Sequence, residues 1–330
     1  MEGYIGKKII ITGGRGYIGS KLSTYFSSLD CELIIIDNSN HKWMPSGKKA
    51  KVIHKAINLS EEKAISDTNI FENSDYIFHF ASQEIDYKRN VKEDYNNNSL
   101  STYNLLNKCK NLLSKPKIIY SSAAMIYGLT NKLPVNEKHY NSPPSIWAIH
   151  KLISEMYLKY FHKICGMKTL SLRLSNIYGP TDRLEIFSRV VLNKISIKAY
   201  NEQQIHIFNN SKCKRDFIYI DDVINAFLFT IFLTDKFFNG NHFVIGSGET
   251  TTFDDLSIKL INKKENIKII KDEKTQMHLA EYRDFVADSS LFSSKTNWKS
   301  KVKLDEGLNR TLDFIKNNNN KLKCLYQKHH

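Results

Sequence analysis

The chain has 330 residues, of which 41% are hydrophobic, and this is enough for one large α/β unit or for a core with a smaller lobe. Its formal charge of +14 comes from lysines spread along the whole chain, without the dense basic and aromatic cluster of a nucleic-acid groove, so no nucleic-acid partner is expected. Five scattered cysteines without Cys-x-x-Cys spacing argue for reduced thiols in the cytoplasm and against a metal site. The polar start and the longest apolar run, residues 226–233, fit neither a signal peptide nor a membrane span, so no membrane partner is expected.

Short apolar strands alternate with amphipathic helices in the first half of the chain, which is the pattern of a doubly wound parallel sheet of the Rossmann type. Strands are predicted at residues 8–12, 33–37, 51–54, 76–80, 117–121 and 169–174. The helices between them are predicted to begin near Tyr17, Glu61, Asn98 and Ile146. Right-handed crossovers place the carboxyl ends of these strands on one edge of the sheet, where ligands bind.

A glycine-rich turn follows the first strand and opens the first helix, with the sequence Thr12-Gly13-Gly14-Arg15-Gly16-Tyr17-Ile18-Gly19. A strand, a turn of this kind and a helix in succession indicate a dinucleotide-binding site. Gly13 allows the tight turn, Gly16 lets backbone N–H groups approach a pyrophosphate, and Gly19 lets the helix pack closely on the sheet. The start of the helix, with Tyr17 and Ile18, supplies N–H donors and a partial positive charge for the phosphates.

Asp37 ends the second predicted strand, and Asn38 follows it. A carboxylate there accepts hydrogen bonds from the adenosine ribose and repels a 2′-phosphate, which favours NAD over NADP. Arg15 favours NADP instead, because a guanidinium near the turn could bind a 2′-phosphate. We give Asp37 more weight and expect NAD as the cofactor.

The second half of the chain has longer loops and mixed elements. We expect a loop and an amphipathic helix over residues 180–204, an edge strand at 206–208, an apolar helix over 221–233, a buried strand at 242–245, and surface helices at 254–262 and 304–316. The polar residues 317–320 are predicted to be a frayed tail. The predicted domains are an NAD-binding Rossmann domain, residues 1–175, to which segment 217–247 returns, and a smaller C-terminal substrate-binding lobe, residues 176–330.

Further motifs follow one another in a fixed order from Lys8 to about Phe314. They are His79-Phe80-Ala81-Ser82, the segment Asn98–Leu106, the segments Leu172–Pro180 and Arg215–Val223, and at the end Arg283, Asp288, Trp298 and Leu304–Leu308. With the glycine-rich turn, they resemble the extended short-chain dehydrogenase/reductases, specifically the NAD-dependent nucleotide-sugar epimerase/dehydratase group. The resemblance implies carbohydrate-biosynthesis chemistry on a nucleoside-diphosphate sugar.

The resemblance also implies binding roles at matching positions. Asn176 would hydrogen-bond the substrate diphosphate, and Arg215 and Arg283 would grip it with guanidinium forks. The motif positions Phe80, Ala81, Asn58 and Leu59 would lie along the cofactor, with Asn58 where the family usually has an aspartate that meets the adenine amine. Family members pair two helices, here near residues 98–112 and 147–164, across a two-fold axis, so a homodimer is expected.

The position of the family's catalytic tyrosine holds a different residue in this chain. Family members carry a tyrosine four residues before a lysine on one helix, so that both face the nicotinamide. Lys151 is present, but Trp147 stands at the tyrosine position. An indole N–H only donates hydrogen bonds, so Trp147 cannot act as the base.

The motif after the fifth strand departs from the family in the same direction. Ala123 stands where the family has a serine or threonine, with Ser122 one residue short. Ala124 and Met125 occupy the positions of the acid/base pair of sugar 4,6-dehydratases and can move no proton. The resemblance therefore does not favour 4,6-dehydration.

Two interpretations stay open from these departures. The leading one is an NAD-dependent oxidoreductase or epimerase with an atypical proton relay, in which Lys151 works with Tyr127 or Ser122, or else with His79, His150 or a water. The rival is a catalytically silent relative that binds NAD and a nucleotide sugar as a structural or regulatory protein. Arg173 and Asp216 could either form a buried ion pair between the lobes or contact the ligand.

Overall fold

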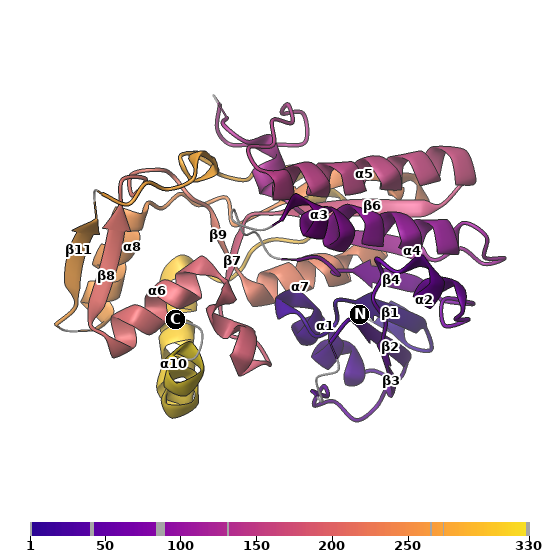
Figure 1. Ribbon diagram of the computed structural model, residues 1–330, viewed down its shortest axis with the longest axis horizontal. Coiled ribbons are helices and arrows are strands. Elements are labelled where there is room, and N and C mark those ends of the chain that lie inside the picture. Colours follow the sequence, from indigo (N-terminus) through magenta and orange to yellow (C-terminus); the bar gives the residue numbers. More distant parts are fainter. Residues whose placement is uncertain are drawn as a thin grey trace.

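The core of the molecule is a seven-stranded parallel sheet in the order β10-β6-β5-β4-β1-β2-β3 (Figure 1). The computed structural model describes residues 2–39, 43–83, 90–130, 132–264, 266–272 and 274–327. The strands of this sheet are β1 (Lys8–Thr12), β2 (Glu32–Asp37), β3 (Lys51–Ala56), β4 (Tyr76–His79), β5 (Lys117–Ala123), β6 (Lys168–Leu174) and β10 (Asn239–Ile245). The Rossmann-like α/β fold is as predicted from the sequence.

Alternate residues of the central strands build two separate hydrophobic layers. Ile9 and Ile11 of β1 face one cluster, whereas Ile10 faces the other. The first cluster is covered by α1 (Tyr17–Ser27), α7 (Ile220–Phe229) and α9 (Ser290–Thr296); the second is covered by α2 (Glu62–Ser66), α4 (Ser101–Cys109) and α5 (Ile146–Cys165). Burial on both faces explains why these strands read as continuous apolar runs.

The helix predicted to begin near Asn98 begins earlier. It starts as α3 (Val91–Asp94), continues through a π-helical turn (Tyr95–Leu100) and runs directly into α4. Asn98 lies in the π-helical turn and is fully buried. Such turns widen a helix locally and occur often at functional sites.

A smaller lobe lies on the left of Figure 1, away from the strands β1 to β3. It contains α6 (Val191–Asn201), β8 (Gln204–Phe208), α8 (Phe253–Lys263), β11 (Lys268–Asp272) and α10 (Leu304–Gln327). Strands β8 and β11 pair in parallel, and a second short pair, β7 (Asn176–Tyr178) with β9 (Phe217–Tyr219), lies between the lobe and the large sheet. Strand β11 was not predicted from the sequence.

Segment 217–247 contributes to both parts of the molecule. It contains β9, then α7, which packs beside α1, and finally β10, which pairs with β6 at the edge of the large sheet. The proposed boundary near residue 175 stays a prediction.

The predicted frayed tail at residues 317–320 is wrong, because these residues lie inside α10. Leu308, Ile315 and Leu322 are spaced seven residues apart and are all buried, so they form one apolar stripe along the helix. Ile315 and Leu322 pack with Phe187 and with Ile197 of α6. This packing extends the helix through its run of asparagines. Within the described residues, no helix combines the length and the apolar character that crossing a membrane needs.

Candidate active site

Two cavities meet at the glycine-rich turn between β1 and α1. The Asp37 pocket has a volume of about 410 Å³ and includes residues at the carboxyl end of β2. The Lys151 cleft has a volume of about 370 Å³ and lies between the carboxyl ends of β5 and β6 and the lobe. The residues that line both cavities are Gly13, Gly16, Phe80, Ser82, Gln83 and Arg189. One ligand can therefore extend from the first cavity into the second.

Three of the four glycines of the turn were assigned roles from the sequence, and they meet different surroundings. Gly13 has φ +64°, and a Cβ there would lie 2.6 Å from the Ala81 nitrogen. A Cβ on Gly19 would lie 2.2 Å from the Gly13 carbonyl oxygen, so the fold itself requires both glycines. At Gly16 the nearest atom would be the Gly13 oxygen at 3.1 Å. The protein packs far less tightly against Gly16, which leaves its open side for a ligand and fits the approach of a pyrophosphate.

The start of α1 faces the junction of the two cavities. Gly16 is the N-cap residue, and Tyr17, Ile18 and Gly19 of the first turn line the Lys151 cleft. The Tyr17 hydroxyl donates a hydrogen bond to the Gly179 carbonyl oxygen at 2.5 Å, which ties the helix to the lobe. The turn and the helix start are thus held in a geometry that suits an anionic group.

Asp37 is held in place by the backbone around it. One carboxylate oxygen accepts from the Arg15 backbone N–H at 3.1 Å, and the other accepts from the Ser39 N–H at 3.1 Å and the Ser39 hydroxyl at 2.9 Å. The Arg15 side chain is buried, and its guanidinium donates to the Ser39 carbonyl and lies 3.1 Å from His54 Nδ1. Asn38 also lines this pocket.

The other predicted cofactor residues line the same pocket. Asn58, Leu59, Phe80 and Ala81 all border it. The Asn58 side chain donates to Glu61 and accepts from Ser60, so it also organises the turn that begins α2. Every residue predicted to bind the cofactor lines one of the two cavities.

Lys151 projects from α5 to the floor of the cleft and is 4% exposed. Its Nζ donates to the Ser121 carbonyl oxygen at 2.9 Å and lies 4.9 Å from the centre of the Tyr120 ring and 5.4 Å from that of Trp147. Burial lowers the pKa of Lys151 to about 7, and the coulombic effect of Glu155 opposes this shift.

Trp147 stands one helical turn before Lys151 and also lines the cleft. Its indole N–H donates to the Gln83 carbonyl oxygen at 2.7 Å. This hydrogen bond joins α5 to the segment after β4. It also occupies the only polar atom of the indole, so Trp147 serves as a wall of the cleft.

A buried ion pair lies behind the cleft floor. Arg173 of β6 contacts both carboxylate oxygens of Glu155, at 2.9 Å from Nε and 2.6 Å from Nη2. The Ser122 hydroxyl donates to the same carboxylate at 2.5 Å, and Arg173 Nη1 donates to Asn141 at 2.7 Å. The ion pair between Arg173 and Asp216, one of the two alternatives left open by the sequence, is therefore wrong. The i,i+4 spacing of Lys151 and Glu155 could have directed attention to Glu155.

Asp216 has a different role, because it joins three backbone segments. Its carboxylate accepts from the N–H groups of Ser247, Gly248 and Ala287 and from the hydroxyls of Ser175 and Ser247. Burial raises the pKa of Asp216 above its usual value, and the hydrogen bonds from Ala287, Ser247 and Gly248 reduce the size of this shift. Asp216 thus fixes the positions of the backbone segments that connect the large sheet to the lobe.

Tyr127 is not part of the cleft lining. It is buried, its hydroxyl lies 3.0 Å from His242 Nε2, and the Arg173 guanidinium covers its ring at 4.6 Å. Burial raises its pKa well above the ordinary tyrosine value. The structure therefore does not bring Tyr127 to the cleft surface beside Lys151, which removes the geometric basis for its expected role as a base.

Two histidines considered for proton transfer are also placed away from the cleft lining. His79 is fully buried between Thr12 at 2.6 Å and Thr102 at 2.9 Å, and burial lowers its pKa to about 3. His150 is buried on another face of α5, where Nδ1 lies 2.8 Å from the Ser99 hydroxyl. Both are structural groups in this fold.

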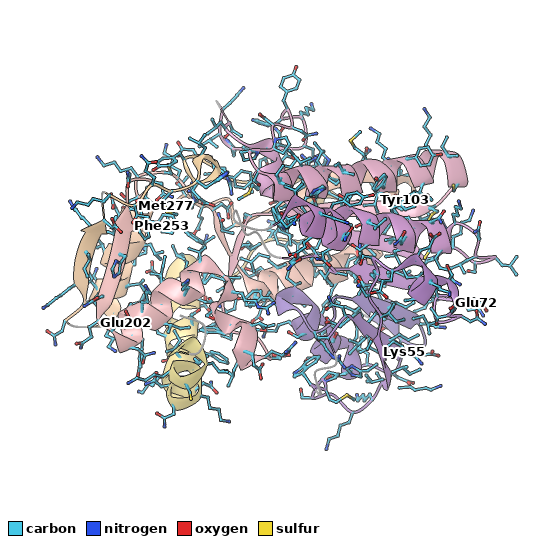
Figure 2. The ribbon with its side chains drawn as sticks, in the orientation of Figure 1. Lys55, Glu72, Tyr103, Glu202, Phe253 and Met277 are labelled. Carbon is cyan, nitrogen blue, oxygen red and sulfur yellow. The ribbon has the colours of Figure 1, made fainter. Side chains whose placement is uncertain are left out.

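Two of the three predicted substrate residues border the cleft. Asn176 and Arg283 line it, with Asn176 held by the Asp216 carbonyl oxygen at 3.1 Å. Arg215 does not line it: its guanidinium donates to the carbonyl oxygens of Arg283 and Glu281 and lies 5.7 Å from the ring centre of Phe253, which Figure 2 labels in the lobe. Arg189, which the sequence analysis missed, lines both cavities and is exposed.

Residues 9–246 match the family described as the NAD dependent epimerase/dehydratase family. The chain belongs to this family. The matched segment runs from β1 to the end of β10 and contains both cavities except for a few residues from the lobe. Family membership makes NAD the cofactor. Among the described residues, no group of histidine, cysteine, aspartate and glutamate side chains is arranged to hold a metal ion.

Several similar proteins cover nearly the whole chain. The dTDP-4-dehydro-6-deoxyglucose reductase of Escherichia coli is 27% identical, over 93% of this chain and 97% of its own. A UDP-glucose 4-epimerase from Thermotoga maritima, crystallised with UDP-glucose, is 27% identical, with a TM-score of 0.81 and coverage of 94% and 99%. An epimerase from Methanothermobacter thermautotrophicus, 20% identical with a TM-score of 0.83 and coverage of 98% and 96%, shares the fold.

Proposed function

We propose that this protein is an NAD-dependent oxidoreductase or epimerase that acts on a nucleoside-diphosphate sugar. The observation that carries the proposal is the continuity of the two cavities at Gly16, with Asp37 at one end and Lys151 beside the second cavity. A dinucleotide fits this arrangement with its adenosine toward Asp37 and its reactive end toward Lys151. Bound NAD supplies the hydride acceptor and donor for the sugar.

The lobe side of the Lys151 cleft favours an anionic substrate. Arg189, Arg283 and Asn176, the first residue of β7, line the cleft. A diphosphate suits guanidinium groups because each can donate two parallel hydrogen bonds. The substrate names of the two relatives at 27% identity, a UDP-glucose epimerase and a dTDP-sugar reductase, support a nucleotide sugar as the ligand.

The Lys151 cleft, which we call the reaction end, lacks two proton-transferring side chains that family members carry. We infer that the proton relay is atypical. Trp147 replaces the expected tyrosine, and Ala123 replaces the expected hydroxyl residue. Ala124 and Met125 also line the cleft, and neither can transfer a proton, so the site does not support sugar 4,6-dehydration. Oxidation of a sugar hydroxyl needs only a hydride acceptor and one base, which the cleft supplies through Lys151.

The test is reduction of NAD in a single turnover, followed by the ultraviolet absorbance of NADH, with a panel of UDP-, dTDP-, GDP- and CDP-sugars. We expect at least one sugar to give slow reduction. The control is Lys138→Met, which removes an exposed lysine that lines neither cavity and should react like the wild type. Mass spectrometry of ligands released from the purified protein identifies the sugar independently.

A silent binding protein is the second candidate function, and one specific observation favours it. Ser122 is the cleft-lining hydroxyl nearest in sequence to the missing one, and its hydrogen is committed to Glu155. If bound NAD stays oxidised with every sugar while calorimetry detects tight binding of one of them, this candidate replaces the enzyme.

We also propose that two copies pair through α4 and α5. These helices lie side by side, and several large apolar or aromatic side chains on them are exposed, including Tyr103, Met156, Tyr160 and Ile164 (Figure 2 labels Tyr103). Pairing these helices across a two-fold axis would bury the patch in a four-helix bundle. Light scattering at micromolar concentration is expected to give twice the chain mass, and a strictly monomeric mass would refute the pairing.

A further inference from the structure

Lys151 is the one side chain of the cleft lining, among the described residues, that can exchange a proton near neutral pH. The other ionisable side chains of the lining are Tyr17, Arg189 and Arg283. The Tyr17 hydroxyl donates to Gly179, and burial raises its pKa far above neutrality. Arginine stays protonated in proteins, so neither guanidinium can act as a base.

Within the part of the chain that the structure describes, the Lys151 amine has no carboxylate partner. Glu155, one turn further along α5, is the nearest acidic group in sequence on the same face of the helix. Both of its oxygens are already engaged by Arg173, and one also accepts from Ser122. No ion pair to Lys151 is present among the described residues, and its single hydrogen bond is to the neutral Ser121 carbonyl.

The other groups packed around the amine do not stabilise a positive charge in its place. On β4, His79 interacts electrostatically with Lys151 and is neutral, because burial holds its pKa at about 3. The Tyr120 and Trp147 rings cover the amine from two sides. The attraction between these rings and a cation is weaker than that of a paired carboxylate, and the rings exclude water. A buried ammonium with such neighbours readily loses its proton.

We infer that Lys151 itself is the proton acceptor and donor of the reaction, without an intervening hydroxyl side chain. This inference rests on the proposed function. The neutral amine takes the proton of the sugar hydroxyl, so the O–H bond breaks and an N–H bond forms. The hydride of the same carbon passes to NAD, the oxidant that the family supplies, and the alcohol becomes a ketone. In the reverse direction the ammonium returns the proton to the oxygen.

Trp147 makes this direct role geometrically reasonable. At a position where a tyrosine would place its hydroxyl between the lysine and the substrate, the indole directs its N–H to the Gln83 carbonyl. The ring therefore presents only its hydrocarbon surface to the cleft. Lys151 and Trp147 both border the cleft, so a substrate hydroxyl can meet the amine without an intermediary.

The first test measures the titration of Lys151 in the intact protein without substrate. Trace acetic anhydride is added from pH 5 to 10, and acetylation of each lysine is followed by peptide mass spectrometry. We expect Lys151 to become reactive with a midpoint near 7, well below the ordinary lysine pKa of 10.5. A Lys151 whose reactivity is still rising at pH 10, as for an ordinary lysine, overturns the inference. An amine that never reacts also overturns it, because a base must be open to the cleft.

The second test compares single-turnover NAD reduction in Lys151→Arg and Lys151→Met with the wild type. Arginine keeps the charge but cannot release its proton, so both variants are expected to lose at least about a hundredfold in rate, the usual contribution of a positioned base. The wild-type rate is expected to rise with pH around the midpoint found by acetylation. NAD affinity of each variant is measured in parallel, so that a loss of binding is separated from a loss of rate.

The two tests separate failure of the inference from failure of the proposed function. A wild type that reduces NAD normally, with a Lys151→Arg variant that retains its rate, refutes Lys151 as the base and leaves the function intact. A low acetylation midpoint without NAD reduction by any sugar refutes the function instead. A pH profile whose midpoint differs from the titration of Lys151 assigns proton transfer to another group and overturns the inference.

Discussion

The two ends of the joined cavities differ in what builds them. At the Asp37 end, the turn depends on backbone: Gly13 and Gly19 have no room for a side chain, and Asp37 is fixed by N–H groups. At the Lys151 end, the chemistry depends on single side chains at the end of β5 and on one face of α5. A binding geometry made by backbone therefore resists substitution, whereas reacting groups can be exchanged without disturbing the fold around them.

The Lys151 end depends on the buried ion pair between Arg173 and Glu155 for its support. Arg173→Met leaves the Glu155 carboxylate buried without its partner, and the expected loss is about 3–5 kcal/mol of unfolding free energy. Urea unfolding measures it. As a control, Arg310→Met removes an exposed pair with Glu306 and should cost less than about 1 kcal/mol. If Arg173→Met loses less than about 1 kcal/mol of unfolding free energy, the buried pair does not support the cleft.

The next prediction tests the Asp37 end directly. Gly16→Val places a side chain where a pyrophosphate would approach, so NAD affinity is expected to fall at least about a hundredfold, or about 2.7 kcal/mol. The fold should persist, because the added Cβ meets only the Gly13 oxygen at 3.1 Å. Gly19→Val is the contrasting variant and should unfold the protein. Calorimetry with NAD and thermal unfolding give both readouts, and normal NAD binding by Gly16→Val would contradict the assignment.

Trp147→Tyr is expected to change the reaction end without changing cofactor binding. A tyrosine hydroxyl next to Lys151 adds a second proton-transfer group, so single-turnover NAD reduction should rise by about tenfold or more. Trp147→Phe removes the indole N–H without adding a hydroxyl and is the matched control. If tyrosine gives no more activity than phenylalanine, the reaction end lacks more than this one hydroxyl.

The smallest expected effect concerns cofactor preference. The wild type should bind NAD more tightly than NADP by about tenfold, because the Asp37 carboxylate repels a 2′-phosphate. Asp37→Asn should narrow this ratio, and Arg15→Ala should widen it, since the Arg15 guanidinium lies beside the Ser39 carbonyl in the same pocket. Affinities for both cofactors, measured side by side, decide the matter. Tighter NADP binding by the wild type would show that Arg15 outweighs Asp37.

The sequence was most informative where local rules fix the structure. The positions of most strands along the chain, the turn at Gly13 and the placement of Asp37 follow from apolar runs and glycine spacing. These signals act over a few residues. The helical run of asparagines in α10 could not be read in this way, because it depends on packing of Ile315 and Leu322 against distant residues. Long-range packing overrides local composition there.

At the reaction end, the missing catalytic side chains could be predicted from the sequence, whereas the side-chain pairings could not. The absence of a tyrosine at Trp147 is visible in the sequence. That Arg173 pairs with Glu155, and that Tyr127 turns to His242, depend on how β6, α5 and β10 stack, which no motif records. These pairings decide which side chains face the cleft.

Strand β10 has a consequence for any attempt to divide the protein. It supplies the final strand of the large sheet, beside β6, only after the chain has passed through the lobe. A fragment ending at residue 175 would leave the seven residues of β6 with a row of unpaired N–H and C=O groups. An open, apolar edge of this kind recruits other chains, so such a fragment should aggregate even with its glycine-rich turn intact.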